Sequence, residues 1–172
     1  MVELSKINHK IDVQYSEGEA PEGDLGCLVK KAILTALQSE AVDMLCAINV
    51  LITDDKEIGE YNKKYRGVDS FTDVLSFPMQ EFSRAGWHGL IQAEIDEETG
   101  DLPLGDVIIS LETVKRQAID YGNSIEYEMI YLTTHSTLHL LGYVHDNIDD
   151  EKLMHIKSKE IIKEMGFTVN DK

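Results

Sequence analysis

Apolar residues along the chain follow two spacings, one typical of strands and the other typical of helices. They alternate with polar residues over 11–15, which predicts a first strand, and an acidic loop over 16–23 ends it. Apolar residues recur at helical spacing over roughly 24–39, which predicts an amphipathic helix. The nearly continuous apolar run over 44–52 predicts a strand that is buried on both faces.

Capping residues and a proline mark the next boundaries. Asp54 and Glu57 match a capping box, which predicts the start of a polar helix. The short β-prone stretch over 71–77 predicts a third strand, which Pro78 ends. The stretch over 105–109 predicts a fourth strand.

Three helices are predicted in the last third of the chain. Ser110 caps the first of them. A cap at Asn123 or Ser124 begins the second, which Gly142 ends. The last helix is predicted over 149–165.

The irregular stretch over 80–103 separates the third predicted strand from the fourth. It contains glycines and an acidic run, and we expect it to form a loop or a hairpin insertion. The order of about four strands and about five helices is not a strict β–α–β alternation. It predicts an α+β fold in which one mixed sheet carries the helices, and the chain, 1–172, forms a single domain.

The charge balance narrows the range of partners. The chain has 16 basic and 32 acidic residues, which gives a net charge of −16 with neutral histidines. Because phosphate contacts need clustered Lys and Arg, this charge excludes a protein that coats polyanions in general. A narrow, locally basic nucleic-acid site remains compatible with the composition.

Cysteine usage and hydropathy predict a soluble, intracellular protein. Cys27 and Cys46 lack a CxxC spacing and lie in apolar stretches, which predicts buried, reduced thiols. Residues 1–6 have neither the basic region nor the apolar core of a signal peptide. No apolar run is as long as a membrane span, so we expect no membrane association.

Three of the six histidines fall within one short window. His135 and His139 are four residues apart, so both project from one face of a helix. Gly142 can adopt the left-handed conformation that turns the chain back and brings His145 toward the pair. Three neutral imidazoles suit one Zn²⁺ ion and leave its fourth position open for water or substrate, which predicts a metal-dependent hydrolase. The alternative is a set of hydrogen-bonded core histidines. The other histidines are expected to be ordinary surface or loop residues: His9, His88 and His155.

The histidine spacing is also that of metzincin proteases. Those enzymes need a glutamate directly after the first histidine as the general base. Ser136 stands at that position, and no carboxylate occurs between His135 and His145. A protease is therefore disfavoured, while a zinc hydrolase of another non-RNA substrate remains an alternative.

Arg66 belongs to a second polar patch, just before the third predicted strand. A guanidinium beside a metal suits a phosphodiester, whose transition state gathers charge on its oxygens. Spacing alone favours a simpler interpretation, an ion pair between Arg66 and Asp69. Basic residues could also form a local groove, although such residues usually lie on a solvated surface. The residues concerned are Lys63, Lys64, Arg66, Arg84, Lys115 and Arg116.

Three blocks of the sequence resemble the YbeY family of bacterial rRNA-maturation endoribonucleases. The first is the histidine block over 135–145. The others are Arg66 with the stretch Thr72-Asp-Val-Leu-Ser-Phe-Pro78, and Leu104-Gly-Asp-Val-Ile-Ile-Ser110. With the strands and helices around them, the resemblance covers most of the chain from about residue 50 to residue 166.

The resemblance implies a zinc-dependent endoribonuclease that is specific for single-stranded RNA. It implies a role in small-subunit rRNA 3′-end maturation and in ribosome quality control, with no DNA substrate. It implies His135, His139 and His145 as zinc ligands and Arg66 as the catalytic residue. A cytoplasmic location and an association with the ribosome or a small-subunit ribosomal protein are also implied. Because of the net charge, we expect free RNA to bind weakly and a partner to deliver it.

Two positions depart from the family pattern. Ser136 replaces the usual glycine and is similarly small, so we expect little effect. Val144 replaces the aspartate that usually precedes the third histidine, and losing an aspartate that orients a ligand would weaken metal binding. Asp146 is the neighbour that could substitute. This second departure keeps one further alternative open, a non-catalytic ribosome-assembly factor with a structural metal.

Overall fold

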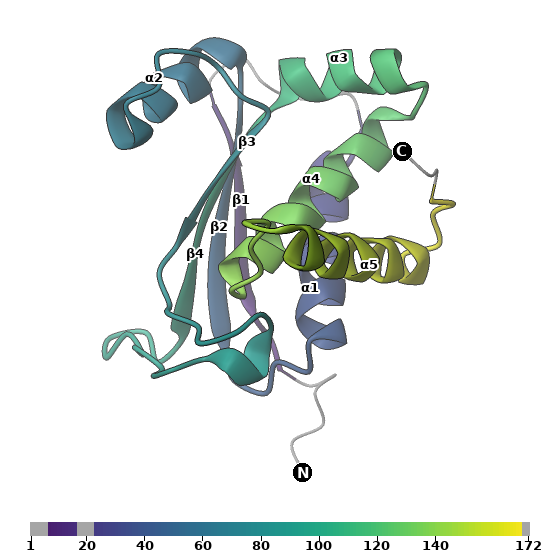
Figure 1. Cartoon of the computed structure of the whole chain (residues 1–172). Coiled ribbons are helices and arrows are strands. Elements are labelled where there is room, and N and C mark those ends of the chain that lie inside the picture. Colours follow the sequence, from purple (N-terminus) through teal and green to yellow (C-terminus); the bar gives the residue numbers. More distant parts are fainter. Residues whose placement is uncertain (1–6, 17–22, 170–172) are drawn as a thin grey trace.

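A four-stranded mixed sheet forms the centre of the fold (Figure 1). Strands β1 (Lys10–Tyr15), β2 (Cys46–Thr53) and β4 (Leu102–Ser110) are parallel, and β3 (Val74–Pro78) pairs antiparallel with β4. The strand order is β1-β2-β4-β3. The computed structural model describes residues 7–16 and 23–169, so the predictions for residues 1–6 and for most of the loop over 16–23 lie outside the described residues.

Five helices surround this sheet in the part of the chain that the structure describes, which confirms the predicted α+β class. They are α1 (Leu25–Ser39), α2 (Asp55–Arg66), α3 (Leu111–Tyr121), α4 (Ile125–Leu140) and α5 (Ile148–Glu164). Helices α1, α4 and α5 lie on one side of the sheet, and α2 lies on the other side near one end (Figure 1). None of the described helices has the length and apolar character needed to cross a membrane.

The predicted caps begin three of these helices. The side chain of Asp54 accepts a hydrogen bond from the Glu57 backbone N–H at 2.7 Å, which begins α2. Ser110 caps α3 in the same way. Of the two residues that the sequence left open for α4, Ser124 is the cap. Each cap satisfies a backbone N–H that has no partner inside the helix.

Strand β2 is covered on one face along its whole length and on the other face only in part. Its residues Ile48, Val50 and Ile52 are buried in the main core, whereas Asn49 is exposed and donates a hydrogen bond to Asp106 at 2.9 Å. The prediction of a strand buried on both faces is therefore wrong. The physical reason is that α2 covers the second face only at the end where Ile58 packs.

A bulge in β4 explains why this strand is longer than predicted. The pairing of β2 with β4 shifts register beside Gly105, so that Leu104 and Val107 are both buried in the main core. Gly105 has a φ of +145°, and a Cβ at this position would lie 2.2 Å from the Phe77 carbonyl oxygen. Only glycine allows β3 and β4 to approach this closely.

The stretch over 80–103 packs against the end of α4. It is mostly irregular, with one bridge between Phe82 and Leu90 and a single 3-10 turn, η2 (Trp87–Gly89). The Trp87 indole is buried and donates to the Asp43 carboxylate at 2.8 Å. The Gly86 N–H donates to the Leu141 carbonyl at 3.0 Å, which ties the stretch to the C-terminus of α4.

Both cysteines are free thiols. Cys46 lies at the start of β2 and is buried as predicted, and its pKa is raised to about 12, mainly by burial. Cys27 is exposed, so the prediction of a buried thiol there is wrong. Cys27 occupies the first turn of α1, where the apolar stripe that faces the core passes through Leu25 and Val29 instead.

Candidate metal centre

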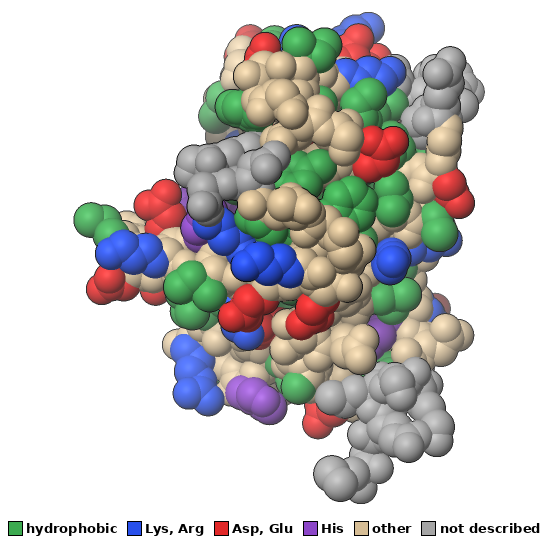
Figure 2. Space-filling model, turned by 90° about the vertical axis from the view of Figure 1, so that its right-hand side faces the viewer, with side chains coloured by type: hydrophobic (Ala, Val, Ile, Leu, Met, Phe, Trp, Pro, Cys, Tyr) green, Lys and Arg blue, Asp and Glu red, His purple; other side chains and the backbone are tan. Residues whose placement is uncertain are grey.

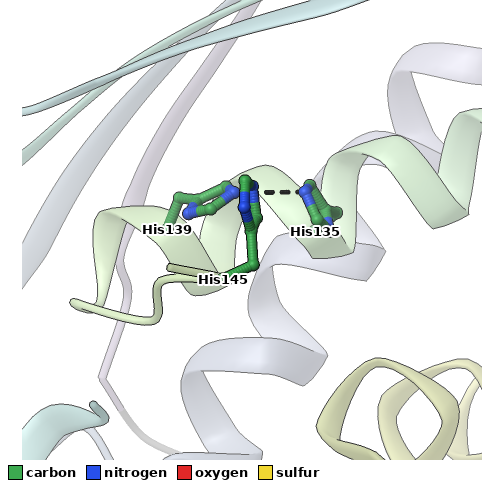
Figure 3. Close-up of side chains that lie close together, drawn as sticks. All are labelled: His135, His139 and His145. Carbon is green, nitrogen blue, oxygen red and sulfur yellow. Dashed lines mark hydrogen bonds between the residues drawn. The ribbon is translucent and has the colours of Figure 1, made fainter. Parts of the chain in front are cut away.

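Three imidazoles converge at the C-terminal end of α4 (Figure 3). The Nε2 atoms of His135 and His139 are 3.1 Å apart, and His145 reaches the same point from the turn after the helix. One nitrogen from each ring lies within 4.8 Å of the others. The structure therefore brings together the three histidines that the sequence singled out.

Gly142 forms the turn that returns the chain to the helix end. Its φ is +84°, and the hydrogen bonds Gly142 N–H to His139 carbonyl and Tyr143 N–H to Leu138 carbonyl complete a Schellman motif. The Phe82 side chain packs directly against Gly142. A Cβ at position 142 would therefore lie only 2.5 Å from the Phe82 Cβ. The turn is thus fixed both by its own hydrogen bonds and by packing from the stretch over 80–103.

Tyr143 anchors the same turn to two other helices. Its hydroxyl donates to Glu40 at 3.0 Å, and Glu40, at the end of α1, also pairs with Lys157 of α5 at 3.2 Å. The Glu40 side chain is only 6% exposed, so this is a nearly buried network. Burial and the negative charge of Glu40 both raise the pKa of Tyr143, which stays a neutral hydrogen-bond donor.

The protonation of the histidines favours a metal. His139 Nδ1 lies 2.8 Å from the Tyr143 carbonyl, which can only accept, so Nδ1 carries the proton and Nε2 keeps its lone pair. Burial above all, together with the neighbouring imidazoles, lowers the pKa of His135 to about 4. Burial also lowers the pKa of His139, with a smaller contribution from the charge of Arg66. Both rings are therefore neutral at pH 7.

This donor set fits a divalent ion of the zinc type. Bonds of about 2.0–2.1 Å from a tetrahedral ion place neighbouring nitrogens about 3.3 Å apart, close to the separation of the two Nε2 atoms. Among the residues that the structure describes, no carboxylate or thiolate joins the three histidines as a fourth ligand. The arrangement therefore has the composition of a catalytic rather than a structural site.

Arg66 is the last residue of α2 and is exposed. Its Nη2 donates to the Ser76 carbonyl of β3 at 3.1 Å, and its charge acts on His139. The ion pair with Asp69 that spacing favoured is wrong, because Lys63 pairs with Asp69 at 2.8 Å. Arg66 is closer to Asp69 in the sequence, but its guanidinium is bonded to the Ser76 carbonyl of β3, and Lys63, one turn earlier on α2, pairs with the carboxylate.

The basic groove suggested by the sequence is reduced by internal pairing. Lys63 pairs with Asp69, and Arg116 pairs with Asp55 at 2.7 Å. Lys64 lies over the ring of Tyr65, 4.8 Å from its centroid. The charge of Arg66 contributes to lowering the pKa of His139, so this member of the set acts on the histidine cluster.

A pocket of about 480 Å³ opens beside the cluster, and the sequence did not indicate it. His135 and His145 form one part of its wall, and His155 of α5, which was expected to be an ordinary surface residue, forms another. Tyr131 also lines the pocket and stacks on His135 with ring centroids 6.2 Å apart. One signal was available, because Tyr131, His135 and His139 repeat at intervals of four along α4.

The two departures from the family pattern have different surroundings. Ser136 is fully buried, and its hydroxyl has no hydrogen-bond partner within the described ranges. Val144 is 42% exposed. The charge of Asp146 raises the pKa of His139. In the part of the chain that the structure describes, however, no histidine donates a hydrogen bond to Asp146.

Comparisons with known proteins agree with the three sequence blocks. The family model described as Endoribonuclease YbeY matches residues 10–166. A protein named Endoribonuclease YbeY from Caldanaerobacter subterraneus subsp. tengcongensis is 44% identical over 161 residues, which covers 94% of this chain and 99% of the relative. One of the same name from Acetivibrio thermocellus is 38% identical and covers 83% of this chain and 88% of the relative. A solution structure from Thermotoga maritima shares the fold, with a TM-score of 0.55, 24% identity and 91% coverage of both chains.

Proposed function

Because this chain belongs to the YbeY endoribonuclease family, we propose that it cleaves single-stranded RNA in ribosomal RNA processing, with His135, His139 and His145 holding one zinc ion. The observation that carries this proposal is the convergence of three imidazoles without a fourth protein ligand in the described chain. A zinc ion held in this way supplies a Lewis acid that activates water or polarises a phosphate oxygen.

Arg66 is proposed as the residue that holds the scissile phosphate. Its bond to the Ser76 carbonyl uses one of five guanidinium N–H donors, and its positive charge lowers the pKa of His139. The remaining donors are available for phosphate oxygens and for the charge that develops on them in the transition state. Asp69, the carboxylate that would compete for this cation, is occupied by Lys63.

The nucleophile is water or the 2′-hydroxyl of the RNA. A 2′,3′-cyclic phosphate among the products identifies the RNA hydroxyl, and its absence identifies direct hydrolysis. A peptidase interpretation has no support, because Ser136 stands where the general base would be and is buried.

The cellular setting follows from the same proposal. We propose small-subunit rRNA 3′-end maturation and ribosome quality control in the cytoplasm, with a small-subunit ribosomal protein as a partner. The net charge of −16 supports delivery by a partner, because it opposes tight binding of free RNA.

The decisive experiment compares cleavage and metal content in matched variants. Purified wild type is expected to cut single-stranded RNA, to lose this activity with a chelator and to regain it with zinc. His139→Ala should lose both zinc and cleavage. Arg66→Ala should keep zinc and lose about 10²–10³-fold in rate, as expected for one transition-state donor.

Two exposed residues outside the centre serve as controls, since His88→Ala and Arg84→Ala remove the same side-chain types. Both are expected to keep zinc and activity. Equal cleavage by wild type, His139→Ala and Arg66→Ala would show that a contaminating nuclease was measured and would refute the proposal. Zinc binding without cleavage in the wild type would instead favour the assembly-factor alternative.

A further inference from the structure

The pocket beside the histidine cluster lies between α4 and α5, and we call it the α4–α5 pocket. Two of the proposed metal ligands belong to its wall, so an occupant would lie directly against the metal centre. Its other principal lining residues come from both helices: Tyr131 of α4 and Lys152, His155 and Ser158 of α5. The volume of about 480 Å³ falls within the range of pockets that enclose a small ligand.

We propose that the α4–α5 pocket is a nucleotide subsite. It takes one nucleotide of single-stranded RNA next to the scissile phosphate, with the base against Tyr131 and the adjoining backbone phosphate at Lys152 and His155. This inference rests on the proposed function, because it assigns the path of the same RNA substrate. The other possible occupant, an acidic peptide segment, is distinguished by the test below.

Tyr131 provides the aromatic surface. It lies one turn before His135 on α4, and the two rings are nearly parallel, with an interplanar angle of 19°. The tyrosine ring therefore lies in the wall of the pocket next to the imidazole on which it stacks. Single-stranded nucleic acids bind by stacking successive bases on such rings, whatever the base.

Lys152 provides the positive charge of the pocket, and His155 adds a ring nitrogen beside it. They are three residues apart, so they lie on one face of α5, and both are exposed. Within the described ranges neither makes an ion pair, whereas the neighbouring Lys157 is paired with Glu40 and Glu160. Lys152 therefore keeps its charge for a ligand in a chain whose net charge is −16.

One acidic residue, Glu151, also lines the pocket. A carboxylate repels a phosphate but accepts hydrogen bonds from the N–H groups on the edge of a base. Glu151 can therefore accept a hydrogen bond from the edge of the base, and the phosphate belongs at Lys152 and His155. The surface around α5 shows why the site must be local: basic and acidic side chains are mixed over this face and do not gather into one basic patch (Figure 2).

Arg66 is held by the Ser76 carbonyl of β3, whereas the pocket is lined by residues of α4, of α5 and of the turn between them. The charge of Arg66 acts on His139, which does not line the pocket, while His135 and His145 do. A strand of RNA held at both places therefore passes across the metal centre. This arrangement needs only two short basic contacts, which fits an acidic protein that cuts RNA without coating it.

The test measures RNA affinity, KM and kcat on a short single-stranded RNA for the zinc-loaded full chain. Tyr131→Ala is expected to weaken binding and raise KM at least fivefold, the lower limit for the loss of one stacked base. Lys152→Gln, which removes the phosphate contact, is expected to weaken binding and raise KM as well. Lys152→Gln should also reduce the slope of log affinity against log salt by about 0.7, the value for one phosphate contact on a single strand.

Three measurements control for structural effects. Zinc content is measured for every variant, because the Tyr131 ring contacts a proposed ligand. Tyr131→Phe, which keeps the ring, should retain wild-type affinity. Lys31→Gln removes the same charge from an exposed position on α1 and should leave affinity and salt slope unchanged.

The outcomes separate this inference from the proposed function. If the wild type cleaves RNA but Lys152→Gln keeps its affinity, KM and salt slope, the subsite is wrong and the nuclease proposal stands. If the wild type neither binds nor cleaves RNA, the proposed function fails. Binding of an acidic peptide that depends on Lys152 but not on Tyr131, with unchanged RNA affinity, would also overturn the nucleotide subsite.

Discussion

The substitution Gly142→Ala should destabilise the protein through two separable effects. The first effect is backbone strain. Residue 142 has a φ of +84°, and this left-handed conformation costs a residue with a Cβ about 1–2 kcal/mol. The second is a clash, because the new Cβ would lie 2.5 Å from Phe82 Cβ and 2.6 Å from Cγ. Overpacking of this kind costs about 1–3 kcal/mol.

Together these effects predict a loss of about 3 kcal/mol, since Phe82 is only partly buried and can move a little. For a chain of this length that corresponds to a decrease in Tm of roughly 6–12 °C. Urea and thermal denaturation of the metal-free protein measure both quantities. The same substitution should weaken metal binding, because His145 follows this turn by three residues.

Gly122 offers a matched control at the end of α3. Its φ is +68°, and no atom lies within 4 Å of the position that a Cβ would take there, so Gly122→Ala carries the backbone cost alone. In a Phe82→Gly background, which also removes the Cβ that an alanine would leave in place, Gly142→Ala should likewise cost only about 1–2 kcal/mol. A cost for Gly142→Ala that equals that of Gly122→Ala, or that does not depend on Phe82, would refute this reasoning.

Two further predictions concern polar networks that join separate elements. Burial alone raises the pKa of Asp55, but hydrogen bonds from Arg116, Ser110 and Thr113 outweigh it and lower that pKa. The stabilisation that results is complete above the unfolded pKa of about 3.9 and is lost as the pH falls through the lower folded pKa. Asp55→Asn should therefore lower the free energy of unfolding by about 1 kcal/mol at pH 7 and by less at pH 3, as measured by urea denaturation. An equal cost at both pH values would contradict this prediction. Glu40→Ala should lower the free energy of unfolding by about 2 kcal/mol, because Tyr143 and Lys157 lose their partner. It should also weaken metal affinity about tenfold in a competition titration, because the Tyr143 carbonyl orients His139. Glu40→Gln, which keeps an acceptor for the Tyr143 hydroxyl, should retain most of the affinity.

Most of the local structure could be predicted because it depends on neighbours in the chain. The caps at Asp54, Ser110 and Ser124 each act over three residues, and the helices begin where those side chains meet a backbone N–H. The histidine cluster could be predicted for the same reason, since a helix turn and a glycine turn bring its members together.

Contacts between distant segments could not be predicted in this way. Spacing paired Arg66 with Asp69, but the packing of α2 beside β3 gives Arg66 the Ser76 carbonyl and leaves Asp69 to Lys63. Strand β2 is nearly continuous in apolar residues apart from Asn49, yet the placement of the helices decides how far its second face is covered.

By itself, the sequence determined the element types, the mixed α+β class and the convergence of the three imidazoles of the candidate metal centre, because those features arise from interactions within a few residues. The tertiary structure alone decided the α4–α5 pocket, the Glu40–Tyr143–Lys157 network and the closure of Phe82 over Gly142. These features join residues from separate elements, and their geometry is set by how whole helices pack, which no local pattern of residues encodes.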